Sequence, residues 1–291
     1  MAADSPTRAS TGRFYVKRAV VPFEEDLHHE FKGHRCLAVE ELAPFSFHDY
    51  DRKKRSKRAA SRAINSFLNS GQGGTVYLGV SDDGSVIGLP MTQYQKDHVV
   101  ISLKDLLEKR YRPTVASDQY QLDFIPVLPP GVHSFDEVSR SHPALSFDVE
   151  LRRRPHQLRT HFPCWCDKDL RAIFHNGHIC PEYLIQIHIK PFESSVEQLF
   201  PSDDTCSSDD DDDGNDDSLD TILKLQLPNV YEDEEGRSYF RLQASSLEYS
   251  LEDIRMMVSS KAKDYYQPIV RRWERQLSRL KKEVSEAGLE T

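Results

Sequence analysis

The chain has 291 residues, of which 38% are hydrophobic, so it is long enough for one large or two ordinary domains with a buried core. No apolar run reaches the length of a membrane span, and the first twelve residues lack the apolar centre of a signal peptide. Five scattered cysteines, an odd number, do not indicate a disulfide framework. We therefore expect a soluble protein without a membrane partner, cytoplasmic or nuclear, with residues 1–12 as a disordered leader.

The net charge of −9 comes from one segment. Residues Ser202–Asp220 hold ten Asp and no Lys or Arg, and without those ten charges the net charge of −9 becomes +1. Blocks of like charge are usually solvated and disordered, which is our main expectation for this acidic insert. The alternative is an autoinhibitory segment that mimics a nucleic acid and lies on a basic groove.

The first structured segment alternates β-branched, aromatic and basic residues over positions 13–22, as a strand or hairpin does. An acidic segment follows and ends in Glu30-Phe31-Lys32. We predict an extended tripeptide with Glu30 and Lys32 on one polar face and Phe31 in the core. This pair is either a surface salt bridge or a site that holds a divalent cation and contacts a phosphate.

A helix is predicted over Asp51–Asn69, with Asp51 as its cap and apolar residues at helical spacing in its second half. Its first half is strongly basic and contains Arg52, Lys53, Lys54, Arg55, Lys57, Arg58 and Arg62. This run can be a solvated helix face, a nuclear localisation signal or a contact surface for a nucleic-acid backbone. Its direct continuation into an apolar face weakens the localisation reading and leaves the other two open.

Gly73 and Gly74 end this helix, and a β-branched and aromatic strand follows at Thr75–Val80. The sequence Asp82-Asp83-Gly84 then predicts a hairpin turn. A phosphate-binding loop follows a strand and opens a helix, whereas this glycine loop has the opposite order. We therefore exclude a nucleotide-binding P-loop.

The remaining pattern combines helices with strands. It predicts a helix over 91–112, strands over 119–128, 144–151 and 183–190, a hairpin around Glu232–Gly236, and helical structure from Leu251 to the C-terminal region. This order indicates an α+β fold with a mixed, mainly antiparallel sheet flanked by helices. We expect one domain over 13–260, interrupted by the insert at 202–220, and a C-terminal helix over 261–291.

One cysteine-rich region is a candidate zinc site. Cys164-Trp165-Cys166 lies near Cys180 and near His178, with His175 as the alternative histidine, and these residues supply sulfur and nitrogen ligands. The Cys-x-Cys spacing is unusual for zinc, so ordinary buried or free thiols are the alternative.

Two motifs, taken in order, resemble the Schlafen family. The first is Glu25-x4-Glu30-Phe31-Lys32, and the second runs from Phe67-Leu68-Asn69 through Gly73-Gly74 and Gly79-Val80 to the Asp-Gly hairpin. The later segment Tyr239–Ser246 is similar to the family's closing strand and Ser-rich turn. The combination resembles the Schlafen AlbA-type domain of small Schlafen-like proteins, which implies an AlbA-type core.

The resemblance implies a metal-dependent endoribonuclease that cuts structured RNA such as tRNA and rRNA, or trims small-RNA precursors. Carried over by motif, the catalytic and metal-binding acids are Glu25, Glu30 and Asp82, with Asp83 as the alternative third acid. Lys32 would contact the scissile phosphate or pair with a glutamate. Mg²⁺ or Mn²⁺ is the expected cofactor, and the basic run at Arg52–Arg62 becomes a stronger candidate for RNA contact.

Two departures shape these expectations. Larger Schlafens carry two related lobes around a groove, whereas one copy of the motif is present here, so we expect a homodimer or a related Schlafen-like partner chain. The spacing of Glu25 and Glu30 puts them on opposite faces of a strand, so they share a metal only if Asp26–His29 forms a turn. The alternative function is a non-catalytic RNA- or DNA-binding module or regulatory subunit of the same fold.

Overall fold

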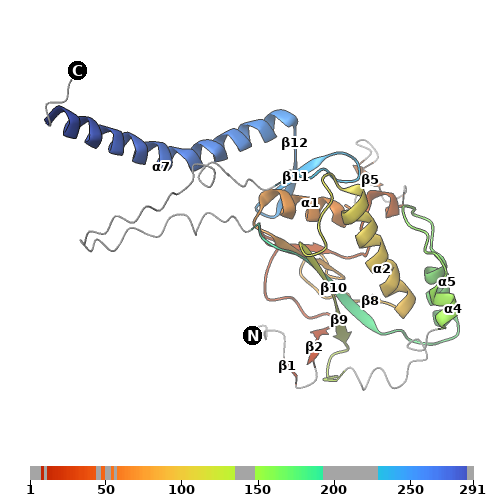
Figure 1. The fold of residues 1–291 in the computed structure, drawn as a ribbon. Coiled ribbons are helices and arrows are strands. Elements are labelled where there is room, and N and C mark those ends of the chain that lie inside the picture. Colours follow the sequence, from red (N-terminus) through yellow and green to blue (C-terminus); the bar gives the residue numbers. More distant parts are fainter. Residues whose placement is uncertain are drawn as a thin grey trace. The chain divides into compact units, whose positions relative to one another are not determined.

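The computed structural model describes residues 8–9, 12–43, 47–49, 54–55, 58–134, 148–192 and 229–286 (Figure 1). The chain divides into two compact units, the first formed by Met1–Phe192 with Pro228–Glu248 and the second by Glu193–Leu227 with Tyr249–Thr291. The fold is α+β, as predicted, with a mixed, curled sheet flanked by helices and a long C-terminal helix. No described helix combines the length and apolarity that a membrane crossing requires.

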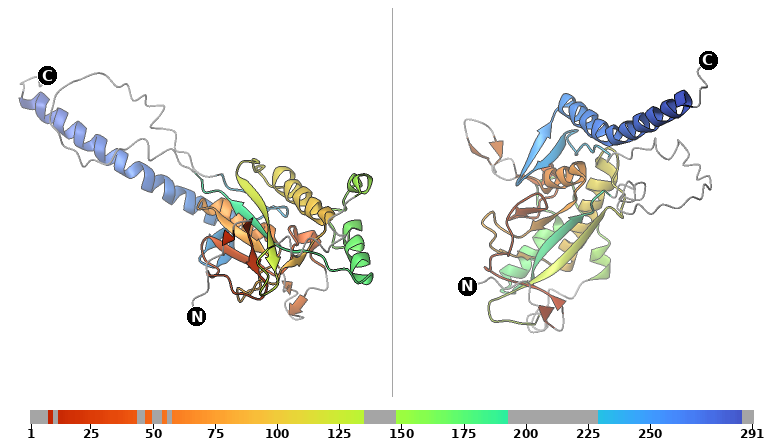
Figure 2. Two further views of the ribbon diagram at one scale, coloured as in Figure 1. Left: turned by 90° about the horizontal axis from the view of Figure 1, so that it is seen from below. Right: turned by 90° about the vertical axis from the view of Figure 1, so that its left-hand side faces the viewer.

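The main sheet of the first unit joins strands that lie between Tyr15 and Ile189 (Figure 2). Its strand order is β3 (Tyr15–Val16), β9 (Tyr120–Leu128), β10 (Glu182–Ile189), β7 (Gly74–Leu78) and β4 (His29–Lys32), and β8 (Leu89–Pro90) also pairs with β10. The β9–β10 and β10–β7 pairs are antiparallel, whereas β3–β9 and β7–β4 are parallel. The strands predicted over 119–128 and 183–190 are thus confirmed.

Helices α1 (Ala60–Ser70) and α2 (Gln93–Asp105) pack on this sheet, and α2 continues into the π-helical turn η2 (Leu106–Arg110). The largest apolar cluster lies between them and includes Phe67 of α1, Leu103 of α2 and Ile187 of β10. Thr92 caps α2, because its side chain accepts a hydrogen bond from the Gln95 N–H. The helix predicted over 91–112 is therefore confirmed, with its start at Gln93.

The buried polar side of α1 binds a segment from much later in the chain. Strands β11 (Ser238–Leu242) and β12 (Ser245–Tyr249) form a separate two-stranded sheet. Asn65 Oδ1 accepts a hydrogen bond from Tyr239 N at 2.7 Å, and Asn69 Oδ1 accepts one from Tyr231 N at 2.7 Å. Buried amides satisfied in this way anchor β11 on α1 and bring its side chains close to β4.

The remaining elements are short, apart from one helix. They are the strands β1 (Arg8–Ala9), β2 (Gly12–Arg13), β5 (Phe47–Asp49) and β6 (Lys54–Arg55), and the helices η1 (Val39–Glu41), α4 (Val149–Arg152) and α5 (Trp165–His175). The second unit contains α7 (Leu251–Glu286), a single helix that includes Pro268. Leu251 begins this helix as predicted.

Two predictions of secondary structure are wrong. The helix expected from Asp51 begins at Ala60, and Lys54–Arg55 lie in strand β6. Like charges three and four residues apart repel one another on a helix, so the basic run does not extend α1. The strand expected over 144–151 is also incorrect, because Val149–Arg152 form a helix whose N-cap, Asp148, accepts a hydrogen bond from Glu150 N at 2.8 Å.

Several predictions lie outside the described residues. They concern the acidic insert at 202–220, residues 1–7, 10 and 11 of the expected leader, and residues 144–147 of the expected strand. The domain boundaries expected from the sequence stay predictions.

Candidate functional site

Strand β4 presents Glu30 and Lys32 on one face and Phe31 on the other, as predicted. Phe31 is only 2% exposed and packs in the second apolar cluster, with Tyr77 and Leu184. Lys32 Nζ lies 2.5 Å from Glu30 Oε1, so the two side chains form an ion pair. This strand therefore holds a charged pair on a rigid edge of the sheet.

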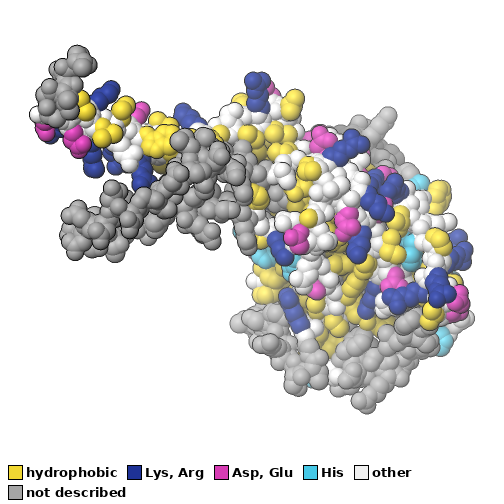
Figure 3. Space-filling view, viewed as in Figure 1, with side chains coloured by type: hydrophobic (Ala, Val, Ile, Leu, Met, Phe, Trp, Pro, Cys, Tyr) yellow, Lys and Arg dark blue, Asp and Glu magenta, His cyan; other side chains and the backbone are white. Residues whose placement is uncertain are grey.

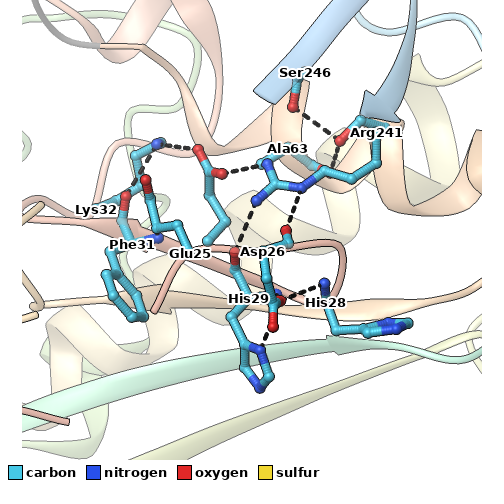
Figure 4. A network of polar contacts seen from close by, with 11 residues as sticks. Glu25, Asp26, His28, His29, Phe31, Lys32, Ala63, Arg241 and Ser246 are labelled. Carbon is cyan, nitrogen blue, oxygen red and sulfur yellow. Dashed lines mark hydrogen bonds and ion pairs between the residues drawn. The ribbon is translucent and has the colours of Figure 1, made fainter. Parts of the chain in front are cut away.

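Arg241 of β11 completes this ion-pair network and is not among the site residues predicted from the sequence. Its fully buried guanidinium pairs through Nη1 with Glu30 Oε2. It also donates from Nε to the Asp26 carbonyl and from Nη2 to the His29 carbonyl, both at 2.8 Å (Figure 4). Arg241 thus compensates the charge of Glu30 and stabilises the turn at Asp26–His29. The available signal was a basic residue inside an apolar strand pattern.

The turn expected between the two glutamates is present. Asp26 Oδ1 accepts hydrogen bonds from the N–H groups of His28 and His29, at 2.7 and 2.9 Å. The turn places the side chain of Glu25 beside β4, where its Oε1 accepts a hydrogen bond from Phe31 N at 2.8 Å. Burial raises the pKa of Glu25, and the neighbouring charge of Glu30 raises it further.

The Asp-Gly hairpin distinguishes its two acids. Asp83 accepts hydrogen bonds from the Ser81 hydroxyl and from Ser85 N, and the Ser81 bond is the main cause of its lowered pKa. Asp82 is exposed, and among the described residues no hydrogen bond or ion pair engages its carboxylate. Asp83 thus serves the turn, which leaves Asp82 available for a ligand.

Two cavities separate the predicted acids. The acidic cavity, of about 500 Å³, is lined by Glu24, Glu25, Asp82 and Asp83 together with apolar residues. The basic cavity, of about 600 Å³, is lined by Glu30, Lys32, Arg58, Arg62, Arg237 and Glu235, among others. The structure therefore brings Glu25 and Asp82 to one cavity, and Glu30 and Lys32 to the other.

The basic run is only partly described. Arg52, Lys53 and Lys57 lie outside the described residues, and the backbone of Lys54–Arg55 forms β6. Arg58 and Arg62 line the basic cavity. Arg62 Nη2 lies 3.2 Å from Glu235 Oε2, and its guanidinium stacks 5.4 Å from the centre of the Tyr239 ring. Two of the predicted nucleic-acid contacts thus flank Glu30 and Lys32.

A different set of side chains forms a compact group of metal-ligand type. The ligand atoms of His98, His156, Cys164 and Cys166 all lie within 4.8 Å of one another, and no other such group of three or more occurs in the part of the chain that the structure describes. His98 Nδ1 is 3.6 Å from Cys166 Sγ, and His156 Nδ1 is 3.6 Å from Cys164 Sγ. The carboxylates of Glu25, Glu30 and Asp82 do not form such a group of mutually close ligand atoms.

Electrostatics favour neutral imidazoles in this His/Cys cluster. Burial lowers the pKa of His98 to about 4 and also lowers that of His156. A neutral imidazole has a lone pair for a metal, and a buried pair of thiols with two imidazoles is a ligand set that can hold a metal such as zinc.

Residues 46–137 match the family model of the Schlafen AlbA_2 domain. This segment is a Schlafen AlbA_2 domain. Within it lie α1, the glycine turn before β7, and the hairpin with Asp82. Glu25 and Glu30 of β4 and its preceding turn come before the matched residues, yet β4 pairs with β7 inside the AlbA_2 domain. The first motif is thus joined to the domain by the sheet.

The His/Cys cluster also crosses the boundary of the AlbA_2 domain. His98 lies on α2 inside it, whereas the other three ligands follow it. The predicted ligands Cys180 and His178 are not in the cluster. Cys164 and Cys166 lie at the N-terminal end of α5, while His178 and Cys180 follow its C-terminal end, about 16 Å away along 11 residues. The two histidines of the cluster come instead from α2 and from the loop before α5.

Proposed function

We propose that this Schlafen AlbA_2 protein is a divalent-metal-dependent endoribonuclease that acts on structured RNA such as tRNA, rRNA or a small-RNA precursor. The observation that carries the proposal is that Glu25 and Asp82, distant in sequence, line one cavity. Glu30 completes the proposed set of three acids from the neighbouring cavity, and its charge acts on Glu25. Carboxylates gathered beside an open cavity are the usual protein ligands of a catalytic divalent cation.

The donor set is consistent with Mg²⁺ or Mn²⁺, both of which prefer oxygen ligands. Asp82 offers its whole carboxylate, and one oxygen of Glu25 accepts the Phe31 N–H. Both oxygens of Glu30 are engaged by Lys32 and Arg241, but each carboxylate oxygen has a second lone pair. A bound cation would neutralise phosphate charge and lower the pKa of a water molecule.

The other groups of the chain would position RNA. Lys32, paired with Glu30, lines the basic cavity, where it can contact the scissile phosphate. Arg58 and Arg62 line the same cavity and can contact backbone phosphates. Arg241 is fully buried, so its role is to position Glu30 and the turn rather than to touch RNA.

The test is cleavage of labelled tRNA with Mg²⁺ or Mn²⁺. We expect Glu25→Gln and Asp82→Asn each to reduce cleavage by more than about a hundredfold. Glu24→Gln and Asp83→Asn are matched controls, because they remove the same charges from side chains that line the same cavity. Unchanged cleavage in Glu25→Gln would contradict the proposed site, and a loss confined to Asp83→Asn would move the third acid to that residue.

A second candidate function is a non-catalytic RNA- or DNA-binding or regulatory subunit. The observation that favours it is the neutralisation of Glu30 by two cations, which suits a structural ion pair as well as a metal ligand. It predicts no cleavage by the wild type, alone or with a Schlafen-like partner chain, together with salt-sensitive binding. Arg58→Ala and Arg62→Ala should each lower the slope of that salt dependence by about 1.

For the His/Cys cluster we infer a structural zinc ion. Two imidazoles and two thiolates are a common closed set for structural zinc. Ligands about 2.0–2.3 Å from a tetrahedral zinc lie roughly 3.3–3.8 Å apart, and the 3.6 Å separations of both His–Cys pairs agree with this geometry. The ion would join α2 to α5 and the loop before it.

A further inference from the structure

Helix α7 carries a regular apolar stripe in its second half. Val270, Trp273, Leu277, Leu280 and Val284 follow one another at alternating spacings of three and four residues. Their side chains are 42–57% exposed, which is unusual for large hydrophobic residues along one line. Figure 3 shows hydrophobic side chains along α7 with Lys and Arg between them. This spacing is the a and d pattern of a heptad repeat.

The residues beside the stripe carry both signs of charge. With Val270 at position a, Glu274 and Lys281 occupy e positions, and Gln276 and Glu283 occupy g positions. The excess of positive charge lies at the outward positions b, c and f, which hold Arg271, Arg272, Arg275, Arg279 and Lys282. Two copies of this helix can therefore meet along the stripe without repulsion between their flanks.

The width of the stripe decides against a lipid surface. A helix that lies on a membrane presents a broad apolar face, usually over a third or more of its circumference. Between Trp273 and Val284 the e and g positions beside the stripe are charged or amide side chains, which leaves only the narrow seam that a second helix covers. Basic charge and amphipathicity alone would favour a membrane surface, so the narrow width of the stripe is the deciding feature.

We propose that α7 pairs with α7 of a second copy of this chain as an antiparallel two-stranded coiled coil. In this arrangement Trp273 lies opposite the partner's Val284, and Leu277 lies opposite the partner's Leu280. Each layer then matches a large side chain with a small one or two of equal size, whereas a parallel pair would place two tryptophans against each other. Glu274 faces the partner's Lys281 across the e positions, twice by symmetry.

The short length of the stripe limits the affinity of the dimer. The described stripe covers about two heptads, so we expect a dimer whose population depends on protein concentration. It links two copies of the AlbA_2 domain in one particle. The inference stands on the surface of α7 alone, and it holds whether or not the protein cleaves RNA.

The first experiment is sedimentation equilibrium of the full chain over a wide range of concentration. The wild type should reach the mass of two chains, and Leu277→Glu should raise the dissociation constant at least about a hundredfold, since each dimer loses two buried leucines. Ser278→Glu is the matched control, because it adds the same side chain on the outward face. Glutamate is a good helix former, so circular dichroism should show α7 intact in both variants.

A charge exchange tests the orientation. Glu274→Lys should weaken the dimer, and the double variant with Lys281→Glu should restore it. Failure of the double variant to restore the dimer would overturn the antiparallel arrangement. A wild type that stays monomeric, or equal effects of Leu277→Glu and Ser278→Glu, would overturn the coiled coil. Binding of a monomeric wild type to phosphatidylserine vesicles, lost in Leu277→Glu, would assign α7 to a membrane surface instead.

Discussion

The acids near β4 and the His/Cys cluster beside α5 both gather side chains of metal-ligand type, but they treat charge differently. Glu30 forms ion pairs with Lys32 and the buried Arg241, and Glu25 and Asp82 line an open cavity. In the cluster the two thiols are buried, and burial holds both imidazoles neutral. The buried carboxylate near β4 is compensated by cationic side chains, whereas burial in the His/Cys cluster disfavours the charged form of the imidazoles.

Under the functions proposed above, this difference corresponds to two different metals with two different roles. Oxygen donors beside a cavity suit Mg²⁺ or Mn²⁺, which keep several waters and stay open to a substrate. A closed set of nitrogen and sulfur donors suits zinc held for structure. The two regions should therefore differ in how strongly their side chains contribute to stability.

The largest effect is expected in the His/Cys cluster. Cys166→Ser should abolish zinc binding and lower stability by several kcal/mol, because a structural zinc ion contributes its binding free energy to folding. Metal analysis of the purified protein and its Tm measure the two results. Cys180→Ser is the matched control, since Cys180 is buried but lies outside the cluster. Equal zinc content in wild type and Cys166→Ser would contradict the assignment.

Arg241→Met should cost about 3–5 kcal/mol, because it leaves the Glu30 carboxylate without its buried partner and frees the carbonyls of Asp26 and His29. Urea unfolding gives the free energy. Arg237→Met is a control with exposed ion pairs to Glu235 and Glu248, and it should cost less than about 1 kcal/mol. Similar costs for the two arginines would show that Arg241 does not hold the site together.

Lys32→Met sharpens the comparison between the two cations of Glu30. Arg241 remains in this variant, so Glu30 keeps one partner, and we expect a cost of about 1–3 kcal/mol by urea unfolding. Because Lys32 also lines the basic cavity, RNA binding should weaken, whereas Arg241→Met should affect binding mainly through folding. A larger loss of stability than that of Arg241→Met would reverse this order.

The smallest effect concerns Glu25 and pH. Its pKa is raised above the ordinary value of 4.5, so the folded protein binds this proton more tightly than the unfolded chain does. That contribution to stability is present below pH 4.5 and is lost as the pH rises through the raised pKa. Glu25→Gln should therefore raise the Tm slightly at neutral pH, and the gain should vanish below about pH 4.5.

Asp83→Asn should change the Tm in the opposite direction to Glu25→Gln. The Ser81 hydroxyl lowers the pKa of Asp83, so its contribution to stability is present above the ordinary value of 3.8 and is lost at lower pH. At neutral pH Asp83→Asn should lower the Tm while Glu25→Gln raises it. Thermal melts over a pH series measure both, and shifts of the same sign would contradict the environments described for the two acids.

Local patterns predicted much of the scaffold. Alternation was sufficient for β4, β9 and β10, and the Asp-Gly pair was sufficient for the hairpin, because these features depend on neighbouring residues. Lys54, Arg55 and Arg58 were wrongly predicted as helix, because like charges repel one another on a helix, whereas the apolar half from Ala60 onward forms α1 and packs on the sheet. That Asp83 and not Asp82 accepts the hydrogen bonds of the turn is visible only in the structure.

The sequence by itself determined the α+β class, the shared face of Glu30 and Lys32, the Schlafen resemblance and the start of the last helix at Leu251, because these depend on residues that are close together in the chain. Only the tertiary structure decided that Arg241 neutralises Glu30, that Glu25 and Asp82 line one cavity, and that His98 and His156 join Cys164 and Cys166. Those groupings join side chains from distant elements. Spacing along a chain carries no information on such contacts until packing brings the elements together.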